Sequence, residues 1–230
     1  MSKSFDTNVA TMRFKDAPWF GHLPSLTIVG AGGIGSWSGV LLGRAGCPKI
    51  TICDMDIYEP HNLGGQLSIT DALEQPKASS LDNLMSDLGC TSAVSSYNVA
   101  YSKMYAKDTM VSAVDNMKAR AEMFKDWKQR PDRKLFVDGR LLAEHFQIFC
   151  VTPGLEEEYE KHLFADTEVE AEACSYKQTS HAAACIGSYI TSFIMNHAAN
   201  LQEGVPIYHV PFYMEQVMSI GLINIEKHGK

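Results

Sequence analysis

The chain has 230 residues, 45% of them hydrophobic and 20% charged, with 20 Lys plus Arg, 27 Asp plus Glu and a formal net charge of −7. Such a composition is close to that of an average soluble globular protein with a sizeable core. The sequence has no apolar run of about 18 residues, which excludes a conventional membrane span. Its acidic balance argues against a protein that mainly coats nucleic acid. The charged start MSKSFDTNVATMRFKD lacks the apolar core of a signal peptide, so we expect a cytoplasmic protein.

The first predicted elements follow an N-terminal arm over residues 1–23. The β-branched run SLTIVG at 25–30 predicts a buried parallel strand. A glycine-rich segment comes next, followed by an apolar stretch over 37–45 that predicts a helix. The run KITICD then predicts a second strand that ends at Asp54. The order strand, glycine loop, helix, strand and acid is typical of a mononucleotide-binding half-domain.

The rest of the chain continues this alternation. Two of its strands follow each other without a helix-length spacer, which favours antiparallel pairing. We therefore expect an α/β fold: a Rossmann-like, mixed and mostly parallel sheet flanked by helices, with a mobile crossover loop. In chain order the further predictions are a helix over 75–88, strands over 93–99 and 110–115, a helix over 116–129, strands over 134–139 and 146–151, a helix over 186–201 and a late edge strand over 221–226.

The glycine loop has the residues that a phosphate-binding turn requires. Gly30 permits a tight turn, and Gly32 and Gly33 let the backbone approach phosphate oxygens. Gly35 lets the following helix lie close to the strand, and the helix N-terminus presents unpaired N–H groups to an anion. We expect Ser36 to cap this helix. The pattern favours nucleotide binding over a purely structural turn.

A second set of polar residues goes beyond what a nicotinamide or flavin site needs. A lysine can neutralise a triphosphate, a carboxylate can hold ribose hydroxyls or Mg²⁺, and amide side chains can bind phosphate oxygens. An NAD-dependent oxidoreductase is therefore only a distant alternative. The set comprises Asp54, Asp56, Asn62, Gln66, Lys77, Asp115, Asn116 and Arg120.

This ordered set resembles the ThiF/MoeB/HesA family, the activating-enzyme superfamily of ubiquitin-like and sulfur-carrier proteins. The family pattern runs Gly-x-Gly-Gly-x-Gly, Asp-x-Asp, Glu-x-x-Asn-x-x-x-Gln, Lys-Ala and Asp-Asn-x-x-x-Arg, and it matches tightly over 25–120. The resemblance implies an adenylyltransferase that binds ATP and Mg²⁺, usually as a homodimer. Its partner would be a small β-grasp, ubiquitin-like protein or a peptide with a free C-terminus, and neither nucleic acid nor a membrane. The enzyme would activate the C-terminal carboxylate and release pyrophosphate.

The resemblance also assigns roles to single positions. Phosphates would face the glycine loop, the ribose would face the first carboxylate, and the Asp-Asn-x-x-x-Arg segment would hold the metal and the attacking carboxylate. The implied nucleotide-binding residues are Gly30, Gly32, Gly33, Gly35, Asp54, Asp56, Asn62, Gln66 and Lys77, with Asp115 as the catalytic and Mg²⁺ ligand and Asn116 and Arg120 as supports of its loop.

Two departures from the family pattern stand out. Gly65 occupies the position directly before Gln66 where the family usually has a phosphate-contacting arginine. We therefore keep open a nucleotide-binding scaffold with weak or no catalysis. We also expect Arg13 to reach the neighbour's triphosphate in a homodimer, against the alternative of a plain surface arginine. The Cys-x-x-Cys pairs that bind structural zinc in many members are missing, so no zinc site is expected.

A cysteine follows an acidic segment in the second half of the chain. Residues 155–172 carry eight acidic residues and one basic residue, a net charge of −7 that equals the net charge of the whole chain. The segment is either a solvated surface segment or a mobile crossover that meets a basic partner. Cys174 lies where some family branches have a thiol that accepts the acyl group, and it is equally well an idle thiol. His181 is a candidate base or a structural residue, and Cys185 is most simply a core residue.

We expect a single ThiF-type adenylation domain over 1–230. After the arm at 1–23, it would consist of a nucleotide-binding half at 24–120 and a partner-binding half at 121–230, with the acidic crossover at 155–175.

Overall fold

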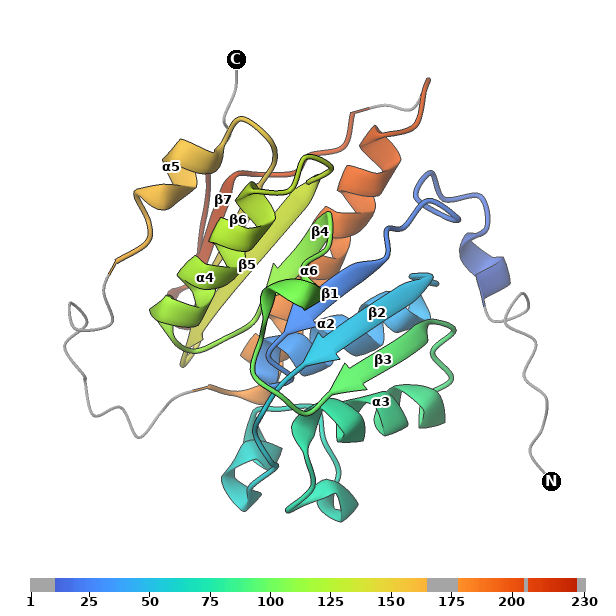
Figure 1. Ribbon diagram of the computed structural model, residues 1–230, viewed down its shortest axis with the longest axis vertical. Coiled ribbons are helices and arrows are strands. Elements are labelled where there is room, and N and C mark those ends of the chain that lie inside the picture. The colour runs from blue at the N-terminus through green and yellow to red at the C-terminus, as the bar shows by residue number, and fades with distance from the viewer. Residues whose placement is uncertain (1–10, 165–177, 205–206, 227–230) are drawn as a thin grey trace.

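The computed structural model describes residues 11–164, 178–204 and 207–226. Its centre is an eight-stranded sheet in the order β3-β2-β1-β4-β5-β6-β7-β8 (Figure 1). Neighbours from β3 to β5 are parallel, and those from β5 to β8 are antiparallel. The strands are β1 (Leu26–Val29), β2 (Lys49–Cys53), β3 (Ala93–Tyr97), β4 (Thr109–Ser112), β5 (Leu135–Leu142), β6 (His145–Val151), β7 (Tyr213–Val217) and β8 (Leu222–Glu226).

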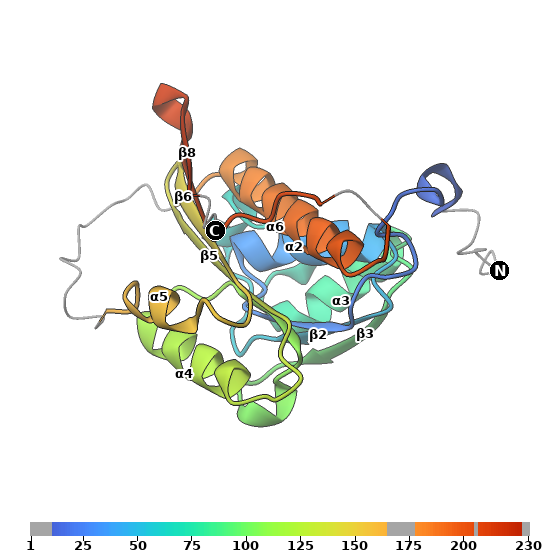
Figure 2. The ribbon, with the colours of Figure 1, turned by 90° about the horizontal axis from the view of Figure 1, so that it is seen from above.

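Helices cover both faces of the sheet (Figure 2). The α-helices are α2 (Gly33–Arg44), α3 (Lys77–Asp87), α4 (Met117–Lys128), α5 (Glu156–Glu160) and α6 (Ser180–Asn200). Single 3₁₀ turns are η1 (Met12–Phe14), η2 (Pro60–Gly64), η3 (Thr70–Ala72), η4 (Lys103–Tyr105) and η6 (Met218–Ile220). None of the described helices is long and apolar enough to cross a bilayer.

Alternation along the strands divides the core between the two faces. Ile28 of β1 packs in one cluster with residues of α2, α3 and α6, whereas its neighbour Val29 packs in a second cluster with residues of α4 and α5. Successive strand side chains point to opposite faces, so a strand covered on both sides reads as one apolar run. For this reason the run at 25–30 is a reliable strand signal.

The expected α/β class is confirmed, including the antiparallel pair of β5 and β6 and the late edge strand β8. Two predictions are wrong in detail. The helix predicted over 37–45 begins at Gly33, so half of the glycine loop is already helical. Ser36 therefore lies inside α2 and does not cap it; Gly32 holds the cap position, and the Ser36 hydroxyl donates to the Gly33 carbonyl. Strand β7 and helix α5 were not predicted.

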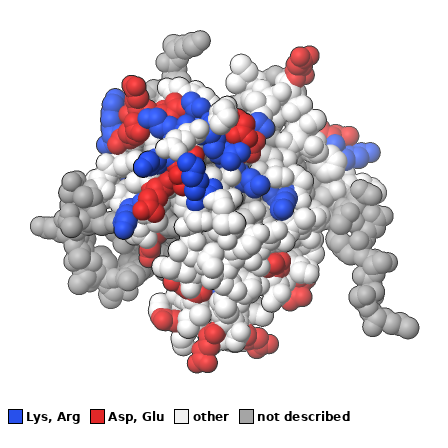
Figure 3. Space-filling view, viewed as in Figure 1, with Lys and Arg blue, Asp and Glu red and all other residues white. Residues whose placement is uncertain are grey.

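The start of the acidic segment is neutralised by bases of the same chain. Glu156 is buried, and its Oε1 accepts from Arg133 Nε at 2.8 Å. Glu160 pairs with Lys128 of α4, also at 2.8 Å. Acidic and basic side chains are interspersed over this α4 and α5 face (Figure 3). The remainder of the segment and Cys174 lie outside the described residues.

Candidate functional site

The candidate site lies at the carboxyl edge of the parallel strands, where β1 turns into α2. Gly30 has φ +94°, and a Cβ there would lie 2.8 Å from the Ala113 carbonyl carbon. A Cβ at Gly35 would run into the carbonyl oxygen of Gly30. Only glycine can occupy either position, because β1, the β4 end and α2 approach one another at backbone distance. Two of the predicted loop glycines are thus required by packing.

The same geometry leaves the N-terminus of α2 facing the edge of the sheet. Helix α2 begins at Gly33 after the Gly32 cap, and its twelve residues carry no acidic residue in the first turn. The first N–H groups of a helix have no partner within the helix and carry a partial positive charge. A phosphate at this end would accept from them.

Asp54 ties the end of β2 to this loop. Its Oδ2 accepts from the backbone N–H of Ala31 at 2.6 Å, and its Oδ1 accepts from the N–H of Asp56 at 2.8 Å. Burial raises the pKa of Asp54 above its ordinary value, and these two hydrogen bonds oppose the rise. The carboxylate stands at the tip of the strand next to β1, which is where a ribose binds in this class of fold.

The turn at 59–66 lies next to the glycine loop. Asn62 is buried, and its Oδ1 accepts from the N–H of Glu59 at 2.9 Å, so this oxygen is used inside the turn. The Asn62 carbonyl accepts from the N–H of Gln66 at 2.9 Å. The Gln66 side chain is buried, and its Nε2 lies 3.8 Å from the position of a Cβ on Gly32. Gln66 therefore borders the glycine loop.

Lys77 is the first residue of α3, and only 10% of its side chain is exposed. Its Nζ lies 3.3 Å from Asp56 Oδ2, and its backbone N–H donates to the Asp56 carbonyl at 2.8 Å. The ion pair with Asp56 holds the Lys77 ammonium at the same edge of the sheet as Asp54, while the aliphatic part of the lysine is buried. An exposed carboxylate is the present partner of the ammonium, so a bound polyphosphate could compete for it.

Asp115 stands exposed on the loop between β4 and α4. The next residue, Asn116, caps α4 by accepting from the N–H of Ala119 at 2.8 Å, and its amide lies 3.4 Å from Asp115 Oδ1. Arg120 is buried and donates to the carbonyl of Val114 at 2.8 Å. Arg120 thus holds the backbone directly before Asp115 and faces the protein interior.

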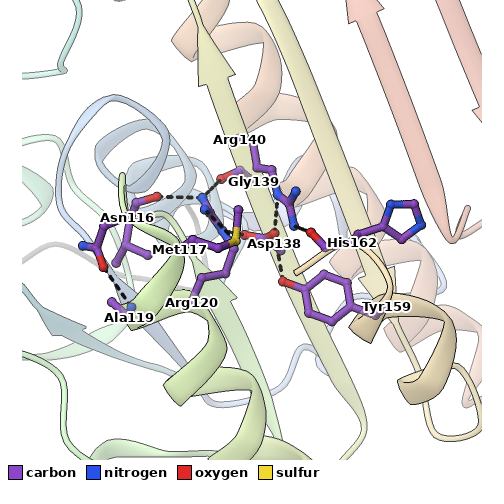
Figure 4. A network of polar contacts seen from close by, with 10 residues as sticks. Asn116, Met117, Ala119, Arg120, Asp138, Gly139, Arg140, Tyr159 and His162 are labelled. Carbon is purple, nitrogen blue, oxygen red and sulfur yellow. Dashed lines mark hydrogen bonds and ion pairs between the residues drawn. The ribbon is translucent and has the colours of Figure 1, made fainter. Parts of the chain in front are cut away.

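A buried polar network, which the sequence pattern did not predict, lies behind this loop (Figure 4). Asp138 of β5 is fully buried and accepts from Arg120 Nε at 2.5 Å, Arg140 Nε at 2.8 Å and the Tyr159 hydroxyl at 2.9 Å. Burial first, and the Asp138 charge second, raise the pKa of Tyr159. A signal was available in the sequence, because an aspartate inside the buried run KLFVDG demands partners.

Three predicted residues lie elsewhere or outside the described chain. Arg13 is exposed in η1, and its neighbour Thr11 lies beside Gly46, just past the C-terminal end of α2, opposite to the end that carries the glycine loop. His181 is exposed and pairs with Glu144 at 3.0 Å. Cys174 falls within 165–177 and is not described.

Among the described ranges, no group of three or more His, Cys, Asp or Glu side chains is arranged to hold a metal ion. A metal at this edge would take Asp115 as a carboxylate ligand and would need its further oxygen ligands from a bound phosphate or water. The site as a whole offers a helix N-terminus, a carboxylate for hydroxyl groups, a lysine and an exposed carboxylate. These groups carry partial or full charges of both signs.

Comparison with known proteins supports the fold of this site. Solved structures that match the chain include E. coli MccB with ATP (13% identity, TM-score 0.67, covering 96% of this chain and 67% of that one). A selenomethionine structure of PaaA matches at 14% identity and TM-score 0.71, over 100% of this chain and 76% of that one. E. coli tRNA N6-threonylcarbamoyladenosine dehydratase, TcdA, matches at 16% identity and TM-score 0.64, over 83% of this chain and 94% of that one.

The chain spans about two thirds of the MccB chain and about three quarters of the PaaA chain. No curated protein sequence matches it. A family model described as the ThiF family matches residues 24–215, which include the glycine loop, the Asp115 loop and strands β1 to β6. Because that match covers most of the chain, this protein belongs to the ThiF family.

Proposed function

We propose that the protein is an ATP-dependent adenylyltransferase that activates a C-terminal carboxylate. The observation that carries the proposal is the Ala31 N–H to Asp54 Oδ2 bond, which puts a carboxylate that could hold a ribose beside the N-terminus of α2. Matching structures named for MccB with ATP and for TcdA with AMP support an adenine nucleotide as the ligand.

In the proposed reaction a carboxylate oxygen of the substrate attacks the α-phosphorus of ATP. A new oxygen–phosphorus bond forms the acyl adenylate, and the bond from the α-phosphorus to the bridging oxygen breaks to release pyrophosphate. The N–H groups at the start of α2 would hold the phosphates, Lys77 would neutralise their charge, and Asp54 would hold the ribose hydroxyls. Gly30, Gly32, Gly33, Gly35, Asp56, Asn62 and Gln66 would complete the nucleotide site.

Magnesium fits this arrangement as a partner of ATP. Asp115 would hold it together with phosphate oxygens, and the ion would neutralise charge on the phosphates. Arg120 would keep the Asp115 loop in place through the Val114 carbonyl. The protein's own contribution is therefore a fixed position for one exposed carboxylate.

The proposed partner is a small β-grasp, ubiquitin-like or sulfur-carrier protein, or a peptide, with a free C-terminus. The peptide alternative is supported by a matching structure named for MccB with AMPCPP and a selenomethionine MccA (12% identity, TM-score 0.69). We further propose transfer of the acyl group to Cys174, and a homodimer in which Arg13 reaches the neighbour's phosphates. Because Arg13 lies at the far end of α2 from its own glycine loop, only a second copy could bring it there; a monomer in light scattering would exclude this role.

A nucleotide-binding scaffold remains the second candidate, because Gly65 offers no side chain to the phosphates. Pyrophosphate exchange separates the two functions. The enzyme should incorporate labelled pyrophosphate into ATP when it is given peptides or β-grasp proteins that end in a free carboxylate. A scaffold should bind ATP and show no exchange with any acceptor.

A further inference from the structure

Gln178 is held next to the glycine loop by the turn between β5 and β6. Its backbone forms a parallel bridge with Ala143 of that turn. Two residues further on, helix α6 begins, and its first residues are fixed by the pair of His181 and Glu144 at 3.0 Å. Figure 1 shows the start of α6 beside the start of α2. The backbone of Gln178 is therefore anchored beside the start of α2.

That side chain fills the space above two glycines. A Cβ at Gly65 would lie 2.7 Å from Gln178 Cγ and 3.1 Å from its Nε2. A Cβ at Gly33 would lie 3.0 Å from Gln178 Cδ, and it would come even closer to its Oε1. Real Cβ atoms do not approach other atoms this closely, so the carboxamide lies directly on the backbone of both residues. Gly33 opens helix α2, and Gly65 ends the turn that precedes Gln66.

A second carboxamide, that of Gln66, borders the same glycine loop. Gln66 is 8% exposed, and its buried Oε1 has no hydrogen-bond partner among the described residues. Its Nε2 lies 3.8 Å from a Cβ position on Gly32, the residue next to Gly33, so Gln66 and Gln178 border neighbouring residues of the glycine loop. An unpaired buried carboxamide oxygen is costly, and the NH₂ of the same group already lies at the loop, where it can donate. Two carboxamides thus converge on the loop from separate segments.

We propose that Gln178 is a phosphate ligand that takes the place of a side chain at position 65. Its carboxamide N–H donates to a phosphate oxygen of the bound nucleotide, in the space that Gly65 leaves open. A larger residue at 65 would displace Gln178, and the two positions therefore depend on each other. The inference rests on the proposed function only in that the nucleotide is ATP.

Calorimetric titration of the full-length protein with ATP and with adenosine tests the inference. Gln178→Glu keeps the shape, removes the donor and adds a negative charge, so ATP affinity should fall about tenfold or more, while adenosine binds within about twofold of the unmodified protein. Gln178→Met removes only the polarity and should weaken ATP by several-fold. Gln129→Glu, on the far face at the end of α4, is the matched control and should leave ATP binding unchanged.

A double-mutant cycle tests the dependence between the two positions. Gly65→Ala should weaken ATP binding because its Cβ displaces Gln178, and Gln178→Gly should weaken it by removing the ligand. The double variant should bind no worse than Gln178→Gly alone, because both changes remove the same contact. Additive losses, ATP binding by Gln178→Met and Gln178→Glu equal to that of the unmodified protein, or tighter binding by Gln178→Gly would each overturn the inference.

The two proposals fail in different ways. ATP binding that depends on Gln178 without any pyrophosphate exchange would leave this inference standing and remove the adenylyltransferase. Pyrophosphate exchange that is insensitive to Gln178 substitutions would do the reverse. No ATP binding by the unmodified protein would overturn both.

Discussion

Arg120 and Asp138 form a buried ion pair, with Nε of the arginine 2.5 Å from Oδ1 of the aspartate. The same guanidinium donates to the carbonyl of Val114, the residue before Asp115. Through Asp138 the pair also reaches Arg140 and the hydroxyl of Tyr159 on α5. The position of the exposed Asp115 loop therefore depends on a charge buried in the neighbouring strand β5.

Asp138→Asn should lower the free energy of unfolding by about 3–5 kcal/mol, because it leaves buried guanidinium groups without their counter-charge. Chemical denaturation measures this loss. The matched control is Asp132→Asn, which removes an exposed partner of Arg130 and should leave the free energy of unfolding nearly unchanged, because solvent screens that pair. Equal effects of the two substitutions would show that the buried pair does not stabilise the fold.

Two glycines of the same loop should respond differently to alanine. Gly35→Ala places a Cβ against the Gly30 carbonyl and should destabilise the protein by the roughly 1–3 kcal/mol or more that overpacking causes. Gly32→Ala meets only the end of the Gln66 side chain, at 3.8 Å, and should keep the fold while weakening ATP binding. Thermal unfolding together with titration separates these effects. Similar melting temperatures for the two variants would contradict the close approach of α2 to β1.

The protein should bind ATP with Mg²⁺ in preference to NAD. Lys77→Ala should weaken ATP by about tenfold or more, since a hydrogen bond to a charged group contributes about 1.5–3 kcal/mol. Lys125→Ala on α4 is the control and should have no effect. Isothermal titration of the unmodified protein and of both variants measures these affinities. Detectable NAD binding with none for ATP would exclude the adenylyltransferase.

If the acyl group moves to Cys174, then Cys174→Ala should separate the two steps. The variant should still exchange pyrophosphate with the true acceptor present, because adenylate formation uses the phosphate site alone. It should fail to form a covalent conjugate that thiols cleave, which gel electrophoresis under non-reducing conditions detects. Full conjugation by the alanine variant would make Cys174 a bystander.

His197 should make stability depend on pH. Burial first, and the charge of Lys134 second, lower its pKa below the ordinary 6.5. The unfolded chain then binds a proton more readily than the folded one, so stability is present above about pH 6.5 and is lost as pH falls toward the lower folded pKa. His197→Gln removes this titration and should flatten the fall between pH 7 and pH 5. Parallel curves of unfolding free energy for the two proteins would contradict the assignment.

The local pattern of the sequence was enough to place most strands and helices. Runs such as those of β1, β2 and β4 are buried on both faces, so nearly every residue is apolar and the strand signal does not depend on its partners. The sequence also predicts that the glycine loop, Asp54 and Asp115 lie at the same edge of the sheet, because the carboxyl ends of parallel strands meet there. Lys77 follows in the chain at the start of the next helix. Strand β7 was missed since its period is masked by polar residues Glu215 and Gln216.

Contacts between distant segments were decided only by the tertiary structure. Nothing near Gln178 in the chain indicates that its carboxamide lies over Gly33 and Gly65, because that placement depends on how α6 packs beside α2 and on the bridge to Ala143. The partners of Asp138 come from α4, β5 and α5, and a buried charge signals that partners exist without naming them. Local periodicity reports which face of an element is buried. Which side chains meet there depends on the packing of whole elements, and that is why the contact of Gln178 with Gly33 and Gly65 was not visible in the sequence.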